Sequence, residues 1–194
     1  MARYSKEGVD YVSVTEILDE IWNKGESFWK WKLFTKQAAE KASVAAAKGT
    51  KIHSLVNKTS QGKRAYYPKI YRPLKPRIEE YFKDKTIVLS EKSLFSVRGF
   101  AGTPDVLYQT GQDFVLEDTK TGKYREHEHK LQLGGYYTLL NDNGYTVSKA
   151  RVCKIQGVDI IPLDWIEKAE LDRLSKLFLN LLELYQWKNK INLK

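Results

Sequence analysis

The pattern of apolar and polar residues switches between helical and extended segments along the chain. Segments with apolar residues three or four apart predict amphipathic helices, and short apolar runs predict strands. Helices are expected at 14–23, 26–48, from 50 onward, at 77–83, at 127–143 and up to about 188. Strands are expected at 86–97, as a pair within 102–120, and as a hairpin from 150–156 to 158–162. This mixture predicts an α/β fold.

The most informative stretch, Gly102–Lys120, predicts two strands joined by a tight turn at Gln109–Gln112. The second strand begins with Phe114–Leu116, which is apolar at every position, and such a run is typical of a strand buried on both faces. That strand then ends in charged residues, among them Asp118 and Lys120. Ionised groups at the end of a core strand are costly unless they are paired or bind a metal, so this strand end is a candidate site.

Three charged side chains are expected to converge there. Side chains alternate along a strand, so Asp118 and Lys120 point to the same face, and Asp105 begins the neighbouring strand beside them. Two close carboxylates repel each other unless a cation lies between them, and such oxygen ligands suit Mg²⁺ or Mn²⁺. An isolated D-x-K pattern is more often a surface ion pair, but the Pro-Asp and the apolar strand before it favour a metal site.

The composition fits one domain over 1–194, with a basic helical arm at 1–85 and a core at 86–194. No run of 18 apolar residues occurs and no apolar stretch follows a basic start, so no membrane partner is expected. A cytoplasmic location is expected, in the host if the protein is viral. The single Cys153 excludes an internal disulfide and a four-cysteine zinc or iron–sulfur site, and we interpret it as a small buried residue.

The net charge of +9 is concentrated in one part of the chain. Residues 30–85 hold 15 Lys or Arg against 4 Asp or Glu, whereas the remainder holds 18 against 20. This asymmetry indicates a polyanionic partner. Aromatic side chains lie among these charges and could stack on unpaired bases. For most of these rings a position in the core is at least as common. The rings are Phe28, Trp29, Trp31, Phe34, Tyr66, Tyr67 and Tyr71.

Glycines divide or interrupt the expected helices. Gly49 is expected to break the second helix and Thr50 to cap the next one, with His53 one turn inside it. Gly134 and Gly135 lie in mid-helix at a cost of roughly 1 kcal/mol each against alanine, which makes sense if sheet or DNA backbone approaches closely.

The last helix is expected to cover the sheet with one apolar stripe, formed by Ile166, Leu174, Leu177, Leu181 and Leu184.

Four short motifs occur in order between Gly49 and Tyr137: GTKIH, GTPD, EDTK and QLGGYY. Together they resemble the PD-(D/E)XK nuclease superfamily, in particular its RecB-type exonuclease branch, which includes the mitochondrial genome maintenance exonuclease and phage proteins. The resemblance implies a restriction-endonuclease-like core with a central mixed β-sheet flanked by helices. It also implies a deoxyribonuclease that uses Mg²⁺ or Mn²⁺, without an iron–sulfur cluster, in DNA replication, recombination or repair.

The resemblance also implies a role for each matching residue. Asp105, Asp118 and Lys120 would be catalytic, and Asp105, Asp118, His53 and the carbonyl of Thr119 would hold the metal. Accessory or DNA-binding roles are expected for Glu91, Gln132, Tyr136, Arg72, Lys75, Arg77, Tyr124 and Arg125. For Glu91, a solvent-exposed charge on a strand is an equally good interpretation. Ends of single-stranded DNA are the expected substrate. A structure-specific or restriction-like endonuclease and a catalytically inactive DNA-binding accessory protein are the alternatives.

Overall fold

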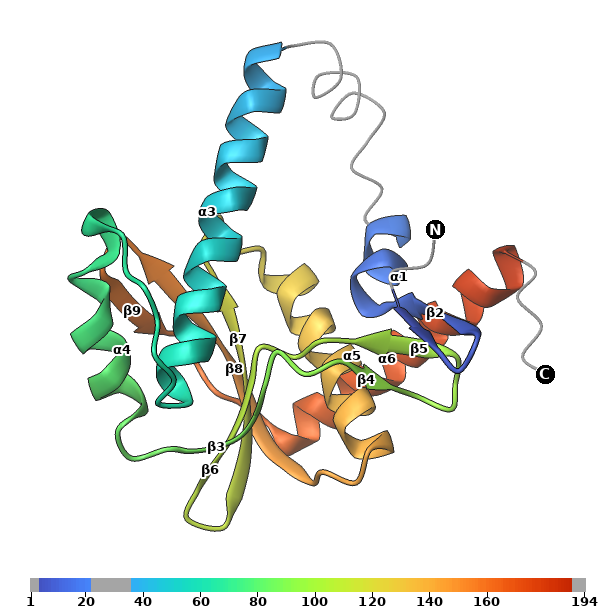
Figure 1. Ribbon diagram of the computed structural model, residues 1–194. Coiled ribbons are helices and arrows are strands. Elements are labelled where there is room, and N and C mark those ends of the chain that lie inside the picture. Colours follow the sequence, from blue (N-terminus) through green and yellow to red (C-terminus); the bar gives the residue numbers. More distant parts are fainter. Residues whose placement is uncertain (1–3, 22–35, 190–194) are drawn as a thin grey trace.

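The computed structural model describes residues 4–21 and 36–189, and it contains two β-sheets with helices packed around them (Figure 1). The larger sheet consists of β3 (Thr86–Ser90), β6 (Val106–Thr110), β7 (Asp113–Lys120), β8 (Val147–Gln156), β9 (Asp159–Pro162) and β10 (Ile166–Glu167). Its order is β10-β8-β7-β6-β3, with β9 also paired to β8. β7 and β8 run parallel and the other pairs run antiparallel. The expected α/β class and the mixed sheet are therefore confirmed.

β7 lies inside this sheet, between β6 and β8. Every residue from Val115 to Thr119 is buried, which confirms that the second strand of the predicted pair is covered on both faces. The turn between β6 and β7 includes Gly111, whose φ of 61° lies in the left-handed region that favours glycine. The β6–β7 hairpin therefore lies inside the sheet. The end that carries Asp105, Asp118 and Lys120 is opposite the turn.

A smaller sheet consists of β1 (Tyr4–Lys6), β2 (Val9–Ser13), β4 (Leu94–Phe95) and β5 (Phe100–Gly102), in the order β1-β2-β5-β4. β2 pairs in parallel with β5, which lies nearly ninety residues later in the chain. The expectation of helices alone before residue 86 was therefore wrong. Strands of three and five residues are too short to show a clear period in the sequence, and a distant partner stabilises them.

The helices cover both faces of the larger sheet (Figure 1). One face packs against α1 (Val14–Ile21), α5 (Glu126–Asp142) and α6 (Lys168–Lys188), and the other against α3 (Lys36–Ser60) and α4 (Leu74–Phe82). The hydroxyl of Ser13 accepts a hydrogen bond from the amide of Glu16 at 3.0 Å and so caps the start of α1. Gly144, at φ 84°, follows the end of α5, where the left-handed region suits a glycine.

α3 runs through Gly49 without a break, which corrects the expected helix boundary there. The hydroxyl of Thr50 donates to the carbonyl of Ala46 at 3.1 Å, as inside a helix, and does not cap a new one. A Cβ on Gly49 would lie 3.2 Å from the Thr121 hydroxyl, so this glycine permits a close approach. The expected helical residues 26–35 lie outside the described residues.

Two further boundaries differ from the expectation. The strand expected at 86–97 is divided between β3 in one sheet and β4 in the other, and Glu91, at φ 47°, lies in the break. α4 begins at Leu74, before the expected Arg77, although Pro76 lies in its first turn. Proline is tolerated there because the first amides of a helix have no partner within the helix. A short 3₁₀ turn at Lys69–Tyr71 precedes α4.

The apolar face of α6 agrees only in part with the predicted stripe: Leu174 belongs to both, and Ile166 is buried but lies in β10. Leu171, Leu174, Phe178 and Leu182 are buried, whereas Leu177 and Leu184 of the predicted stripe are 42% and 60% exposed. The predicted stripe and the buried face both have apolar residues at helical spacing. The packing partners of α6 decide which of the two is buried.

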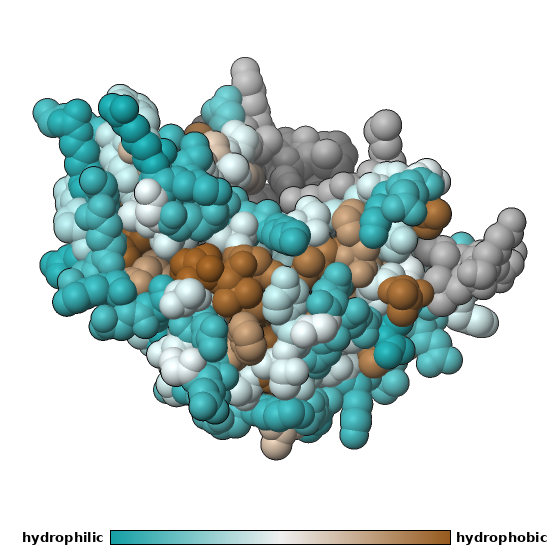
Figure 2. Space-filling model, turned by 60° about the horizontal axis from the view of Figure 1, so that its bottom comes forward, coloured by the Kyte–Doolittle hydropathy of each residue, from teal (hydrophilic) through white to brown (hydrophobic). Residues whose placement is uncertain are grey.

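Hydrophobic side chains also reach the surface. Seen from below, a band of them crosses the middle of the molecule between hydrophilic borders (Figure 2). No helix among the described residues is long and apolar enough to cross a membrane. Cys153 is buried and unpaired.

Candidate metal centre and cleft

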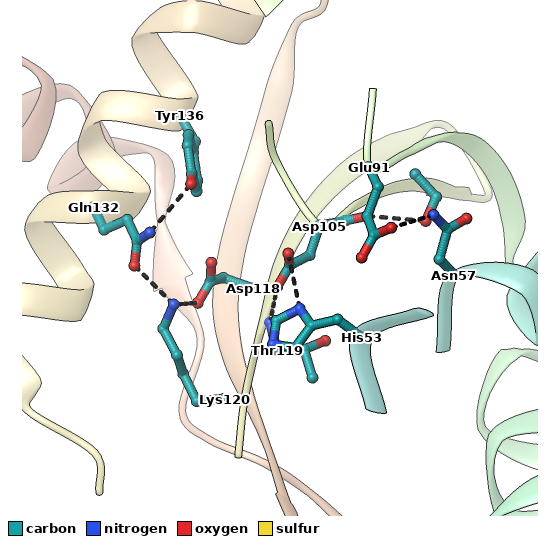
Figure 3. A network of polar contacts seen from close by, with 10 residues as sticks. His53, Asn57, Glu91, Asp105, Asp118, Thr119, Lys120, Gln132 and Tyr136 are labelled. Carbon is teal, nitrogen blue, oxygen red and sulfur yellow. Dashed lines mark hydrogen bonds and ion pairs between the residues drawn. The ribbon is translucent and has the colours of Figure 1, made fainter. Parts of the chain in front are cut away.

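The end of β7 and the start of β6 bring the three predicted charged residues together (Figure 3). Asp118 and Lys120 extend from the same face of β7, and the ammonium Nζ lies 2.5 Å from the Oδ2 of Asp118. Asp105 lies just before β6, where its Oδ2 accepts a hydrogen bond of 2.7 Å from the amide of Thr119. The antiparallel pairing of β6 and β7 therefore places both carboxylates at the same end of the hairpin, where both line one cleft.

α3 and the break after β3 add two further candidate ligands. The Nδ1 of His53 lies 3.2 Å from the Oδ1 of Asp105. Glu91 accepts a hydrogen bond of 2.6 Å from the Nδ2 of Asn57, which also belongs to α3. Ligand atoms of His53, Glu91 and Asp105 all lie within 4.8 Å of one another. This is a donor set for a divalent cation, and it includes a carboxylate that the sequence suggested only for an accessory role.

The buried carboxylate of Asp118 fits the same interpretation. Its side chain is 3% exposed, and its Oδ2 has no hydrogen-bond partner among the described residues. Its one ion-pair partner among the described residues is the Lys120 ammonium, which lies 2.5 Å from that oxygen. A buried carboxylate oxygen that is only partly satisfied is costly, and a metal ion would satisfy it. The residues present therefore fit a divalent cation.

The titration behaviour of the site follows from burial and mutual charge. Burial raises the pKa of Asp118 to about 6, and nearby Asp105 adds to this effect against the opposing charge of Lys120. Burial lowers the pKa of His53, but the hydrogen bond to Asp105 and the negative charges of Asp105 and Asp118 outweigh it, so the net shift is upward. A bound cation would stabilise the ionised form of Asp118 against the cost of burial, and it would also offset the negative charges that raise the pKa of His53.

α5 holds the lysine from the other side. The Nζ of Lys120 donates to the Oε1 of Gln132 at 2.8 Å, and the Nε2 of Gln132 donates to the hydroxyl of Tyr136 at 3.1 Å. Gln132 and Tyr136 are one helical turn apart, so both reach the same point. The tyrosine contact orients the amide so that its oxygen faces the ammonium (Figure 3).

These groups line a cleft of about 670 Å³ between α3 and the smaller sheet. In the part of the chain that the structure describes, Lys120 is the only lysine or arginine that lines it, beside the carboxylates of Glu91, Asp105 and Asp118. Seven hydroxyls complete the walls; they belong to Tyr4, Thr15, Thr50, Ser54, Ser93, Thr103 and Tyr136. No sequence pattern predicted the contribution of β1, whose Tyr4 hydroxyl lies 3.0 Å from the Thr103 hydroxyl. The cleft can bind a polar ligand through neutral donors and one cationic side chain.

The basic residues expected to contact DNA do not line this cleft. Arg72, Lys75 and Arg77 are exposed on and before α4, beyond α3. Lys75 pairs with Glu79 at 3.4 Å, and Arg77 lines a separate hollow between α4 and β9. The basic arm expected at 1–85 therefore does not bring these three residues into the cleft. Phe28, Trp29, Trp31 and Phe34 lie outside the described residues; Tyr66 is exposed and Tyr67 is buried.

The two expected contacts after β7 have structural partners. The guanidinium of Arg125 pairs with Glu128 at 2.9 Å, and its backbone amide donates to the Nδ1 of His129. Tyr124 packs at the edge of the core, with its ring centroid 5.3 Å from that of His129. Neither residue is among those that line the cleft.

Glu117 belongs to a different cluster on the opposite face of β7. Its carboxylate accepts hydrogen bonds from the Nε of Arg151 at 2.9 Å and from the hydroxyl of Tyr81 at 2.7 Å. Burial lowers the pKa of neighbouring Lys85 to about 8. The charged residues at the end of β7 therefore lie on opposite faces of the sheet. Asp118 and Lys120 belong to the candidate site, whereas the charge of Glu117 is neutralised by Arg151 inside the protein.

No protein-family model matches the chain, and no curated protein matches it in sequence. The crystal structure of SSO0001 is similar to it at a TM-score of 0.43 and 17% sequence identity, over 92% of this chain and 79% of that chain. So weak a likeness carries no argument about fold or function, and the site is interpreted from its own geometry.

Proposed function

We propose that the protein is a metal-dependent deoxyribonuclease that hydrolyses phosphodiester bonds, from the ends of single strands. The observation that carries this proposal is the convergence of Asp105, Asp118 and Lys120 in an open cleft, with His53 and Glu91 beside them. The order of the GTPD, EDTK and QLGGYY motifs supports a restriction-endonuclease-like core of the RecB type. Roles in DNA replication, recombination or repair belong to the same proposal.

Each residue has a task that follows from its charge and position. Asp105, Asp118, His53 and Glu91 would hold Mg²⁺ or Mn²⁺, with the Thr119 carbonyl as a further ligand. When bound, the metal would stabilise charge on the scissile phosphate and favour formation of hydroxide. The Lys120 ammonium, aimed by Gln132, orients the attacking water and offsets the phosphate charge. No covalent intermediate with the protein is required.

The cleft supports a single strand as substrate. A volume of about 670 Å³ is in the range of pockets for small ligands, so it suits one or two nucleotides more than a paired duplex. Its hydroxyls can donate hydrogen bonds to phosphate and sugar oxygens without selecting a base. These features favour a sequence-tolerant enzyme over a restriction-like one.

The first experiment compares matched DNA substrates with Mg²⁺ or Mn²⁺. End-labelled linear single strands should be shortened, while circular single strands of the same sequence should persist. Efficient cutting of the circle, or discrete fragments from duplex DNA, would favour an endonuclease. Binding without cleavage under either metal would favour an inactive accessory protein.

A second experiment tests the residues. Asp118→Asn and Lys120→Ala should each abolish cleavage while the protein stays folded, as measured by circular dichroism and melting temperature. Asp113→Asn is the matched control, because Asp113 is exposed at the other end of the same strand. Near-normal hydrolysis by either cleft variant would refute the assignment.

A further inference from the structure

The positive charge of the protein and its cleft lie in different places. From Lys41 to Ile78 the sequence contains ten Lys or Arg and no Asp or Glu. Nevertheless, among the described residues that line the cleft, Lys120 is the only lysine or arginine. The charge that indicates a polyanionic partner must therefore act on a different surface.

That surface lies beyond α3. The segment that follows α3 runs between α3 and α4, on the side of α3 away from α1 and α5 (Figure 1). The amide of Lys63 donates to the carbonyl of Lys58 at 2.8 Å, so the end of α3 and the start of this segment are joined. Lys69 and Arg72 are three residues apart at a 3₁₀ turn and share one side of it. We call Lys58, Lys63, Arg64, Lys69 and Arg72, with Tyr66, the outer basic surface.

The cations of this surface have no carboxylate to neutralise them. All five are exposed, and none has a carboxylate within 4.0 Å among the described residues. Some exposed lysines elsewhere are paired, for example Lys168 with Asp172 at 2.9 Å and Lys83 with Glu80 at 3.7 Å. Unpaired like charges within one short stretch of chain, 58–72, repel each other, and a polyanion relieves the repulsion.

We propose that the outer basic surface is a second binding site for nucleic acid, which holds the substrate strand beyond the part that occupies the cleft. The proposal rests on the proposed nuclease function and adds a binding site to it. The Tyr66 side chain is 76% exposed among these cations, so it offers a ring on which an unpaired base can stack. α3, with a diameter of about 10–12 Å including side chains, separates the two sites, so only a long strand reaches both.

The test uses a double variant and a matched control. Lys63→Gln/Lys69→Gln removes two unpaired charges, and Lys83→Gln/Lys168→Gln removes two exposed charges that are already paired. Binding of a long single strand is measured by fluorescence anisotropy over a series of salt concentrations, without metal so that the strand is not cut. The slope of log K against log salt should become less steep by about 1.4 in the first variant, at about 0.7 per phosphate contact, and should stay near the wild-type value in the second.

Cleavage assays separate the two sites. With metal, the first variant should hydrolyse a dinucleotide at the wild-type rate but require more of the long strand to reach half-maximal velocity. An unchanged salt slope, an equal effect of the control variant, or capture of anionic lipid vesicles in preference to DNA would overturn the proposal. Failure of the nuclease itself would look different, since neither substrate would be cut by the wild-type protein.

Discussion

Replacement of Gly134 by alanine is expected to destabilise the protein, although alanine is the better helix former. Gly134 lies inside α5 against α6, and an added Cβ would lie 2.7 Å from the backbone carbon and oxygen of Leu174. Ordinary contacts begin at 3.4 Å, so the two helices would have to separate by about 0.7 Å. Because the obstacle is backbone, no side-chain rotation relieves it. This contact also corrects the expectation that sheet or DNA approaches the glycine.

The magnitude follows from two opposing contributions. Alanine gains about 1 kcal/mol of helix propensity over glycine. Overpacking costs about 1–3 kcal/mol, and a rigid neighbour favours the upper end of that range. The net loss is therefore about 2 kcal/mol, or a fall in melting temperature of about 4–8 °C for a chain of this length.

Gly49→Ala is the matched control and should have the opposite sign. Gly49 is also inside a helix, but its added Cβ would meet only the Thr121 hydroxyl, at 3.2 Å, and that side chain can rotate. The change should be neutral or stabilising by up to about 1 kcal/mol. Urea denaturation of the metal-free variants, followed by circular dichroism, measures both. A Gly134→Ala variant as stable as the wild type, or a strongly destabilised Gly49→Ala variant, would refute the reasoning.

Three other predictions concern charge. The pKa of Asp118 in the folded protein, about 6, exceeds its ordinary value of 3.8, so ionisation of this group removes stability as the pH rises from about 4 through 6. The unfolding free energy of metal-free Asp118→Asn relative to wild type should therefore rise by about 2 kcal/mol between pH 4 and pH 7, and a flat difference would contradict this. Arg151→Met should cost about 3–5 kcal/mol in urea denaturation because Glu117 is 1% exposed and would lose its cation, while Glu117→Leu added to it should restore much of the loss. His53→Ala should weaken metal binding in calorimetry with little change in the melting temperature of the metal-free protein; the reverse result would make His53 a structural residue.

Local sequence determined the elements that carry the candidate site. The alternation of side chains along β7 is a property of the strand itself. The sequence alone therefore predicts that Asp118 and Lys120 share one face. The turn at Gly111 and the apolar run before Asp118 likewise predicted the hairpin and its burial. The helical spacing of Gln132 and Tyr136 paired these two residues on α5.

Only the tertiary structure decided which of these elements meet. Pairing of β2 with β5 brings Tyr4 to the cleft, and the break between β3 and β4 turns Glu91 toward His53 and Asp105. Packing also placed Arg72 beyond α3, although its charge in the sequence suggested a cleft contact. A periodic pattern records which residues share a face within one element, because the period is set by the local backbone. The partner of that face is chosen by contacts between residues far apart in the chain, and no local period records them.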